Sequence, residues 1–164
     1  MPKKIIYILL IVASAVINQA VWARENHLGR LGVGASNQLA NDLTALSFKV
    51  QKSNAFALGG LLGVSTDNNN GGYGAGLKLY RILFEEPQLT FYFAGLGALI
   101  NHKTTTTEKS GFQFDLTMGT EFSFAGLESL GFTLEFGFSF NKLNDFVVET
   151  VGDHLIAAGV HFYL

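Results

Sequence analysis

The chain has 164 residues, a formal net charge of −2 and no cysteine. Its length fits a single domain. The absence of cysteine excludes a disulfide framework and thiolate metal sites, and the absence of a basic excess argues against nucleic acid as a partner. Hydrophobic residues make up 48% of the chain and charged residues 15%, yet no run reaches the ~18 apolar residues that a transmembrane helix needs.

The N-terminus has the three parts of a secretory signal peptide. Lys3 and Lys4 form a basic start, residues 5–16 are apolar, and Val21-Trp22-Ala23 offers a small-residue cleavage site. We therefore expect a signal peptide over 1–23, cleaved after Ala23, and a mature domain over 24–164. Cleavage would lower the number of Lys and Arg from 11 to 9 against 13 Asp and Glu, which leaves the mature part mildly acidic.

From Leu28 onward, apolar residues alternate with small or polar ones at period two. This period is typical of β-strands with two different faces. It is clearest over 111–124, where one set of alternate residues is rich in Phe and the other set is polar, and again over 131–141. These two segments predict one long hairpin.

The same rule predicts eight strands separated by alternately long and short connections. The predicted strands are 28–36, 43–51, 55–66, 73–84, 88–100, 111–124, 131–141 and 154–164. The short connections are 52–54, 85–87 and 125–130, and the longer ones are 37–42, 67–72, 101–110 and 142–153. In bacterial barrels short turns face the periplasm and longer loops face outward, so both mature termini are expected on the periplasmic side.

The alternation alone does not separate a membrane barrel from a soluble one such as a lipocalin. Eight strands enclose a lumen that side chains just fill, and the Phe and Leu of 111–124 and 131–141 would not fit inside it. The other set of residues is rich in Gly, Ser, Ala and Thr, which suit a narrow lumen. The bulky set is therefore expected to face lipid. The sequence thus predicts an all-β fold, an eight-stranded antiparallel up-and-down transmembrane β-barrel.

The chain resembles the small OmpA/OmpX-like barrels of Gram-negative outer membranes over its whole mature length. The resemblance rests on the signal peptide, the eight segments and the closing strand LIAAGVHFYL. It implies an outer-membrane location after export through the periplasm, contact with lipopolysaccharide, and assembly by the barrel-assembly machinery and periplasmic chaperones as a monomer. Such barrels usually end in an aromatic residue that this machinery reads. Here Phe162 and Tyr163 precede a final Leu164.

Charged residues of the small-residue set are expected to point into the lumen. They are Arg30, Lys49, Lys78, Asp115, Glu121, Glu135 and His161. Buried charges must pair because an isolated one is costly. We interpret these residues as a structural ion-pair network that plugs the barrel; a gate for small ions, suggested by the resemblance, is the alternative. Tyr73, Tyr92 and Tyr163 are interpreted as anchors at the membrane interfaces.

Enzymatic and metal functions find little support in the residues. A lipid A deacylase needs a Ser beside a His base on the lipid face, and none of His27, His102, His154 and His161 has a Ser at that spacing. No cofactor is expected. The function that the sequence favours is a non-catalytic integral barrel with an envelope-structural or surface-contact role. A minor porin-like channel for small solutes and a deacylase-like barrel enzyme are the alternatives.

Overall fold

The computed structural model describes residues 27–67, 69–152 and 155–164. The predicted signal peptide, residues 1–23, lies outside the described residues. The structure contains the strands β1 (Leu31–Ser36), β2 (Ala45–Gln51), β3 (Phe56–Ser65), β4 (Asn70–Glu86), β5 (Leu89–Thr104), β6 (Glu108–Phe124), β7 (Leu127–Lys142), β8 (Phe146–Thr150) and β9 (Ala157–Tyr163). No described helix is long and apolar enough to cross a membrane.

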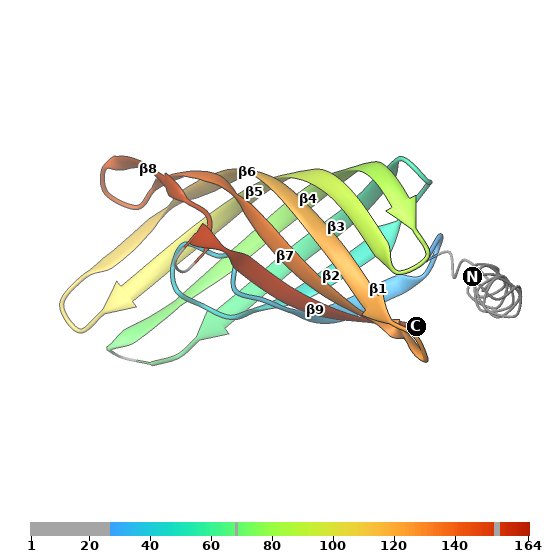
Figure 1. Cartoon of the computed structure of the whole chain (residues 1–164). Helices are drawn as coiled ribbons and strands as arrows, with labels where there is room; N and C mark the ends of the chain where they lie inside the picture. The colour runs from blue at the N-terminus through green and yellow to red at the C-terminus, as the bar shows by residue number, and fades with distance from the viewer. Residues whose placement is uncertain (1–26, 68, 153–154) are drawn as a thin grey trace, which may run out of the picture.

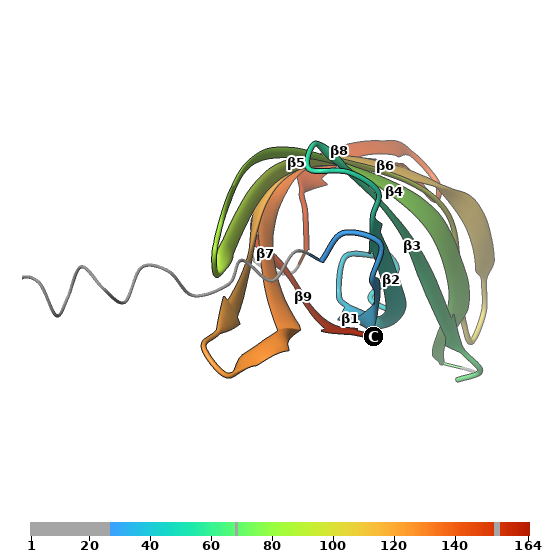
Figure 2. The same ribbon diagram turned by 90° about the vertical axis from the view of Figure 1, so that its right-hand side faces the viewer.

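The strands form a closed barrel, seen from the side in Figure 1 and along its length in Figure 2. Consecutive strands from β1 to β7 pair antiparallel, and β9 closes the ring by pairing with both β1 and β7. β8 pairs with β7 only, further along that strand than β9 does. The predicted fold, an eight-stranded antiparallel barrel, is confirmed.

The eighth barrel strand differs from its predicted form because it consists of two pieces. Thr150 lies opposite Phe138 and Ala157 lies opposite Glu135, both on β7. The connection, residues 151–156, is therefore longer than the stretch of β7, residues 136–137, that lies between these two pairing positions. β8 falls within 142–153, which had been predicted as a loop. β9 lies within the predicted strand 154–164, whereas the prediction of a loop was wrong over 146–150, because this segment does not alternate between apolar and polar residues.

The strand ends away from the short turns also differ from the prediction. β4, β5 and β6 extend into 67–72 and 101–110, so the loops predicted there are mostly strand pairs. Gly71 pairs with Lys103, and Lys103 pairs with Glu108. Polar and glycine residues masked these extensions, because strands that rise beyond an apolar layer do not need the alternating pattern.

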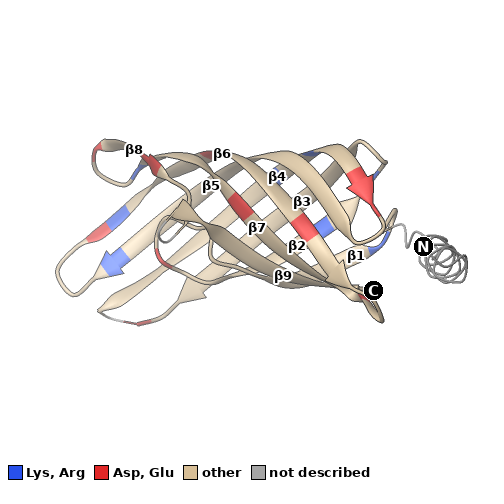
Figure 3. Cartoon of the chain, viewed as in Figure 1, with Lys and Arg blue, Asp and Glu red and all other residues tan. Residues whose placement is uncertain are grey.

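The bulky set of alternate residues faces outward, as the width argument predicted. Leu77 is 77% exposed and Phe138 is 59% exposed. The charged residues are sparse along the strands, as Figure 3 shows. Such an outer surface is stable against lipid, where closure of the ring also satisfies the hydrogen bonds of the strand backbones.

Candidate functional site in the barrel interior

The half of the lumen nearer the short turns holds an ion pair enclosed by tyrosines. Lys49 Nζ on β2 donates to Glu121 Oε2 on β6 at 2.9 Å. The Tyr163 hydroxyl donates to the other carboxylate oxygen, Oε1, at 2.7 Å. Lys49 also lies 4.7 and 4.9 Å from the ring centroids of Tyr80 and Tyr92, a cation–π arrangement. Both charges are therefore compensated from several sides.

A second ion pair lies further from the short turns. Lys78 Nζ on β4 lies 2.6 Å from both carboxylate oxygens of Glu135 on β7. The Tyr92 hydroxyl donates to Glu135 Oε1 at 2.8 Å, and Thr117 Oγ1 donates to Oε2 at 2.9 Å. Lys78 also donates to Gln38 Oε1. This carboxylate thus accepts bonds from three side chains, which offsets the cost of removing it from water.

The connection between β1 and β2, residues 37–44, folds into the barrel mouth. Gln38 donates to Asp115 Oδ2 at 3.0 Å, and Gln113 donates to the Gln38 carbonyl oxygen at 2.9 Å. Asn41 donates to the carbonyl oxygens of Tyr73 and Asn101, at 3.0 and 2.9 Å. Residues 37–42 had been predicted as an outward loop, and 43–44 as the start of a strand; we name the whole segment 37–44 the inner loop. Its amide side chains supply the polar partners that a segment inside a barrel needs.

An apolar cluster holds the same segment in place. Leu39 of the inner loop is buried against five residues of β2, β3 and β5, which are Ala45, Leu61, Leu96, Ala98 and Ile100. A cavity of about 350 Å³ remains at the mouth beside the inner loop, with Gln113, Ser139 and Glu149 among its lining residues. Hydrogen bonds and apolar packing thus hold the inner loop inside this half of the lumen, beside the cavity.

A Ser–His–Glu arrangement lies in the interior, and the sequence reasoning missed it. Ser47 Oγ is 2.8 Å from His161 Nε2, and His161 Nδ1 is 3.8 Å from Glu121 Oε2. Gly34 on β1 pairs with both Ser47 and His161, and a β-carbon at this position would collide with the Val160 carbonyl group. A search confined to the lipid face could not find a pair on the lumen face.

This arrangement does not have the geometry of a catalytic triad. The separation of 3.8 Å between His161 and Glu121 is too long for the hydrogen bond that orients the base. Ser47 is also 2% exposed, whereas a deacylase nucleophile must reach an acyl chain in the bilayer. The contact therefore acts as a hydrogen bond within the packed lumen.

The structure places six of the seven predicted charge-network residues inside the barrel. They are 1% to 4% exposed: Lys49, Lys78, Asp115, Glu121, Glu135 and His161. Arg30 instead lies at the rim, where it donates to the Tyr163 carbonyl oxygen at 2.7 Å and to Ser129 Oγ at 3.0 Å. It precedes β1, so the strand alternation does not apply to it.

Two of the three tyrosines interpreted as interface anchors face the lumen instead. Tyr92 and Tyr163 are buried, because they share strand parity with the polar set; Tyr73 faces outward and is exposed. Of the predicted assembly signal, Phe162 and Leu164 are exposed on the outer face and Tyr163 points inward. Its recognition by assembly machinery stays a prediction. Tyr80 also faces the lumen and was not among the predicted lumen residues. Its position two residues after Lys78, on the same face of β4, could have identified it.

The fold is similar to that of a solved bacterial barrel. The crystal structure of the N-terminal β-barrel domain of Pseudomonas aeruginosa OprF matches with a TM-score of 0.63 and 16% sequence identity, over 84% of this chain and 98% of that chain. No protein-family model matches the chain, and no curated protein sequence matches it. The resemblance to small outer-membrane barrels, stated from the sequence, is confirmed at the level of the fold.

Proposed function

We propose that this chain is a non-catalytic integral protein of a bacterial outer membrane, with an envelope-structural role and a barrel closed by its own interior. The observation that carries the proposal is the filled lumen. Two ion pairs occupy it from wall to wall, and the inner loop closes its outer half. The two ammonium groups and the two carboxylates thus bind one another and neighbouring lumen side chains.

The location is supported by the outer surface of the barrel and by its likeness to the OprF domain. Under this proposal the short turns and both mature termini face the periplasm, and the hairpins β3–β4, β5–β6 and β7–β8 face the cell surface, where they are available for contact. Insertion of such a barrel requires periplasmic chaperones and the barrel-assembly machinery, and it places the outer ends of the strands among lipopolysaccharide. The barrel acts as a monomer.

Conductance in planar lipid bilayers tests the closed lumen. We expect the purified, refolded barrel to insert without producing discrete current steps, because displacing either ion pair would leave buried charges uncompensated. The alternative of a minor channel predicts steps in the wild-type protein that change in amplitude or frequency in Glu135→Ala. Steps of this kind would contradict the proposal. Their absence in a protein whose insertion has been verified would support it.

A further inference from the structure

Arg81 is a charged residue on the apolar outer face of the barrel, near the short-turn end of that face. On β4 it lies between the outward-facing Leu79 and Leu83, and it pairs laterally with Phe56 on β3 and Phe93 on β5. Its guanidinium group stacks 4.6 Å from the centroid of the Phe56 ring. A long basic side chain at this depth can lay its stem along the apolar surface and reach the lipid headgroups with its charged end.

No carboxylate in the described part of the chain forms an ion pair with Arg81. Glu85 and Glu86 follow it on the same strand, but a bulge between Ile82 and Phe84 separates them from its register. The stacked Phe56 ring can stabilise a cation but supplies no hydrogen-bond acceptor. The donors of this guanidinium group are therefore available to an external acceptor.

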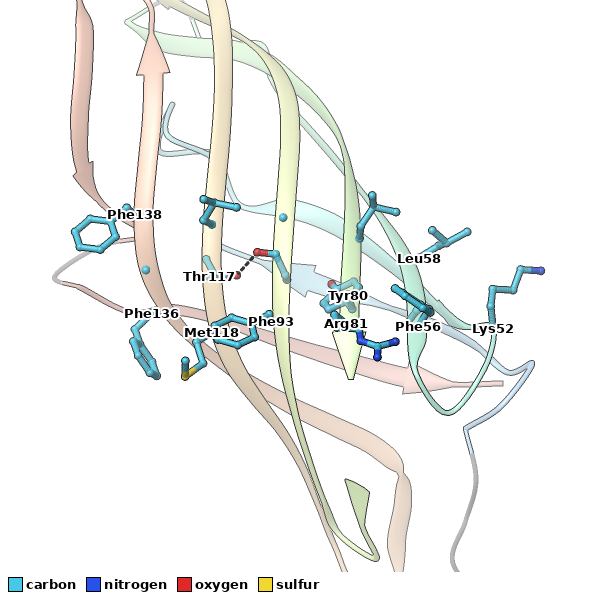
Figure 4. A pocket seen from close by; sticks show the side chains of 16 residues that line it. Lys52, Phe56, Leu58, Tyr80, Arg81, Phe93, Thr117, Met118, Phe136 and Phe138 are labelled. Carbon is cyan, nitrogen blue, oxygen red and sulfur yellow. Dashed lines mark hydrogen bonds between the residues drawn. The ribbon is translucent and has the colours of Figure 1, made fainter. Parts of the chain in front are cut away.

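A groove of about 910 Å³ runs across the outer wall beside Arg81. Its walls include Leu58, Leu79, Phe93, Leu116, Phe136 and Phe138. Figure 4 shows Arg81, Phe56 and Lys52 together at one side of this space and Phe136 and Phe138 at the other. Gly95 lies on the outward parity of β5 between these walls and adds no side chain to fill the space.

The cations lie at the short-turn end of the groove. Lys52 is in the turn between β2 and β3, and its backbone N–H donates to the Phe56 carbonyl oxygen at 3.0 Å. Phe56 is the first residue of β3 and the register partner of Arg81. Both basic side chains therefore lie near one membrane surface, with the apolar walls extending from them toward the bilayer centre.

We propose that this groove binds an anionic glycerophospholipid of the leaflet at the short turns, which is the periplasmic leaflet under the proposed orientation. The lipid phosphate accepts hydrogen bonds from Arg81 and attracts Lys52, and an acyl chain lies over Gly95 between the aromatic and aliphatic walls. A net negative headgroup matches two cations better than a zwitterionic one does. This inference rests on the proposed membrane location but not on the closed lumen.

Native mass spectrometry of the full mature barrel tests the site directly. The probes are phosphatidylglycerol and phosphatidylethanolamine, reconstituted in equal amounts with the protein and released from the same nanodiscs. We expect phosphatidylglycerol to be retained preferentially on the wild-type barrel. A cation near the membrane surface contributes about 1 kcal/mol, so Arg81→Gln should weaken phosphatidylglycerol binding about fivefold, and Lys52→Gln should add to that loss.

The chain offers a matched pair of groove-filling variants. A β-carbon added at Gly95 would have its nearest neighbours at 3.9 and 4.0 Å, and one added at Gly97 would have none within 4 Å. Both substitutions are therefore sterically possible. Gly97 borders a second apolar groove, whose lining residues include no Lys or Arg. Gly95→Leu should abolish the preference for phosphatidylglycerol, whereas Gly97→Leu and the outer-end variant Lys103→Gln should preserve it.

The outcomes separate this inference from the proposed function. Equal retention of the two lipids on an inserted wild-type barrel, or equal effects of Gly95→Leu and Gly97→Leu, would overturn the lipid site and leave the membrane location intact. A dimer lost only in Gly95→Leu would assign the groove to a second copy of the chain and also overturn it. A wild-type chain that does not enter a bilayer would overturn both.

Discussion

At the scale of single residues, the interior depends on charges that compensate one another. Removing a carboxylate and an ammonium group from water costs several kcal/mol per ion, and only good geometry with further hydrogen bonds recovers this cost. Lys78 and Glu135 have both. Lys78 Nζ lies 2.6 Å from Glu135 Oε1, and Tyr92 and Thr117 donate further hydrogen bonds to the carboxylate. The pair therefore fixes how β4, β5, β6 and β7 face each other across the lumen.

Glu135→Ala should destabilise the barrel strongly. The substitution leaves Lys78 buried without its carboxylate, and breaking a buried pair on one side costs about 3–5 kcal/mol. Urea unfolding of the barrel in lipid vesicles measures this change as a lower midpoint.

The double variant Lys78→Met/Glu135→Leu is the control for this prediction. It removes both charges and fills similar volume, so it should recover much of the lost stability. A double variant as unstable as Glu135→Ala would show that the ion pair is not the cause.

At the scale of elements, the barrel departs from a regular one in two places away from the short turns: the divided final strand and the inner loop. The final strand is divided into β8 and β9, and Val151 N–H donates to the Gly137 carbonyl oxygen at 3.0 Å where the first piece ends. Gly152 and Leu155 in the interruption have positive φ values of 72° and 84°, which glycine adopts readily and leucine rarely. β1 ends at Ser36, and the inner loop begins directly after it.

Leu39→Ala should loosen the inner loop without opening the strands. Truncation of a buried leucine costs about 2–5 kcal/mol, and here the loss falls on the contacts of the inner loop with β3 and β5. Hydrogen exchange should become faster for the amides of residues 38–43. The outward-facing variant Leu99→Ala serves as a control that leaves these rates unchanged. Unaltered exchange in Leu39→Ala would mean that hydrogen bonds alone hold the loop.

At the scale of the whole molecule, closure of the ring and an apolar exterior act together. The backbone of a closed barrel leaves no unpaired edge facing lipid, and the outward Leu and Phe side chains require an apolar solvent. At the end of the barrel away from the short turns the pairing is incomplete: β8 pairs with β7 only, and residues 63–65 of β3 pair with β4 only.

Expression of the full chain in a Gram-negative host should place it in the outer-membrane fraction. An unheated sample should migrate differently from a boiled one on a denaturing gel, because the closed barrel resists detergent until it is heated. A soluble periplasmic protein whose gel mobility is the same in the unheated and boiled samples would contradict the membrane location.

The sequence determined the features that depend on neighbouring residues. Side chains alternate between the two faces of a strand. The alternate residues from Phe112 to Phe124 and from Phe132 to Phe140 therefore already indicated the outer wall, and six of the seven predicted charged residues were correctly assigned to the lumen. The same rule, applied to tyrosines, would have placed Tyr92 and Tyr163 inside. The alternation rule does not apply to residues that precede a strand, such as Arg30.

Only the tertiary structure decided which side chains meet. The Lys49–Glu121 and Lys78–Glu135 bonds join residues 72 and 57 positions apart, and Ser47 meets His161 across Gly34. The inward fold of the inner loop and the groove beside Arg81 likewise depend on the stagger of strands around the ring. The physical reason is that the alternating pattern is local to each strand, whereas the stagger is set by closing all eight strands together.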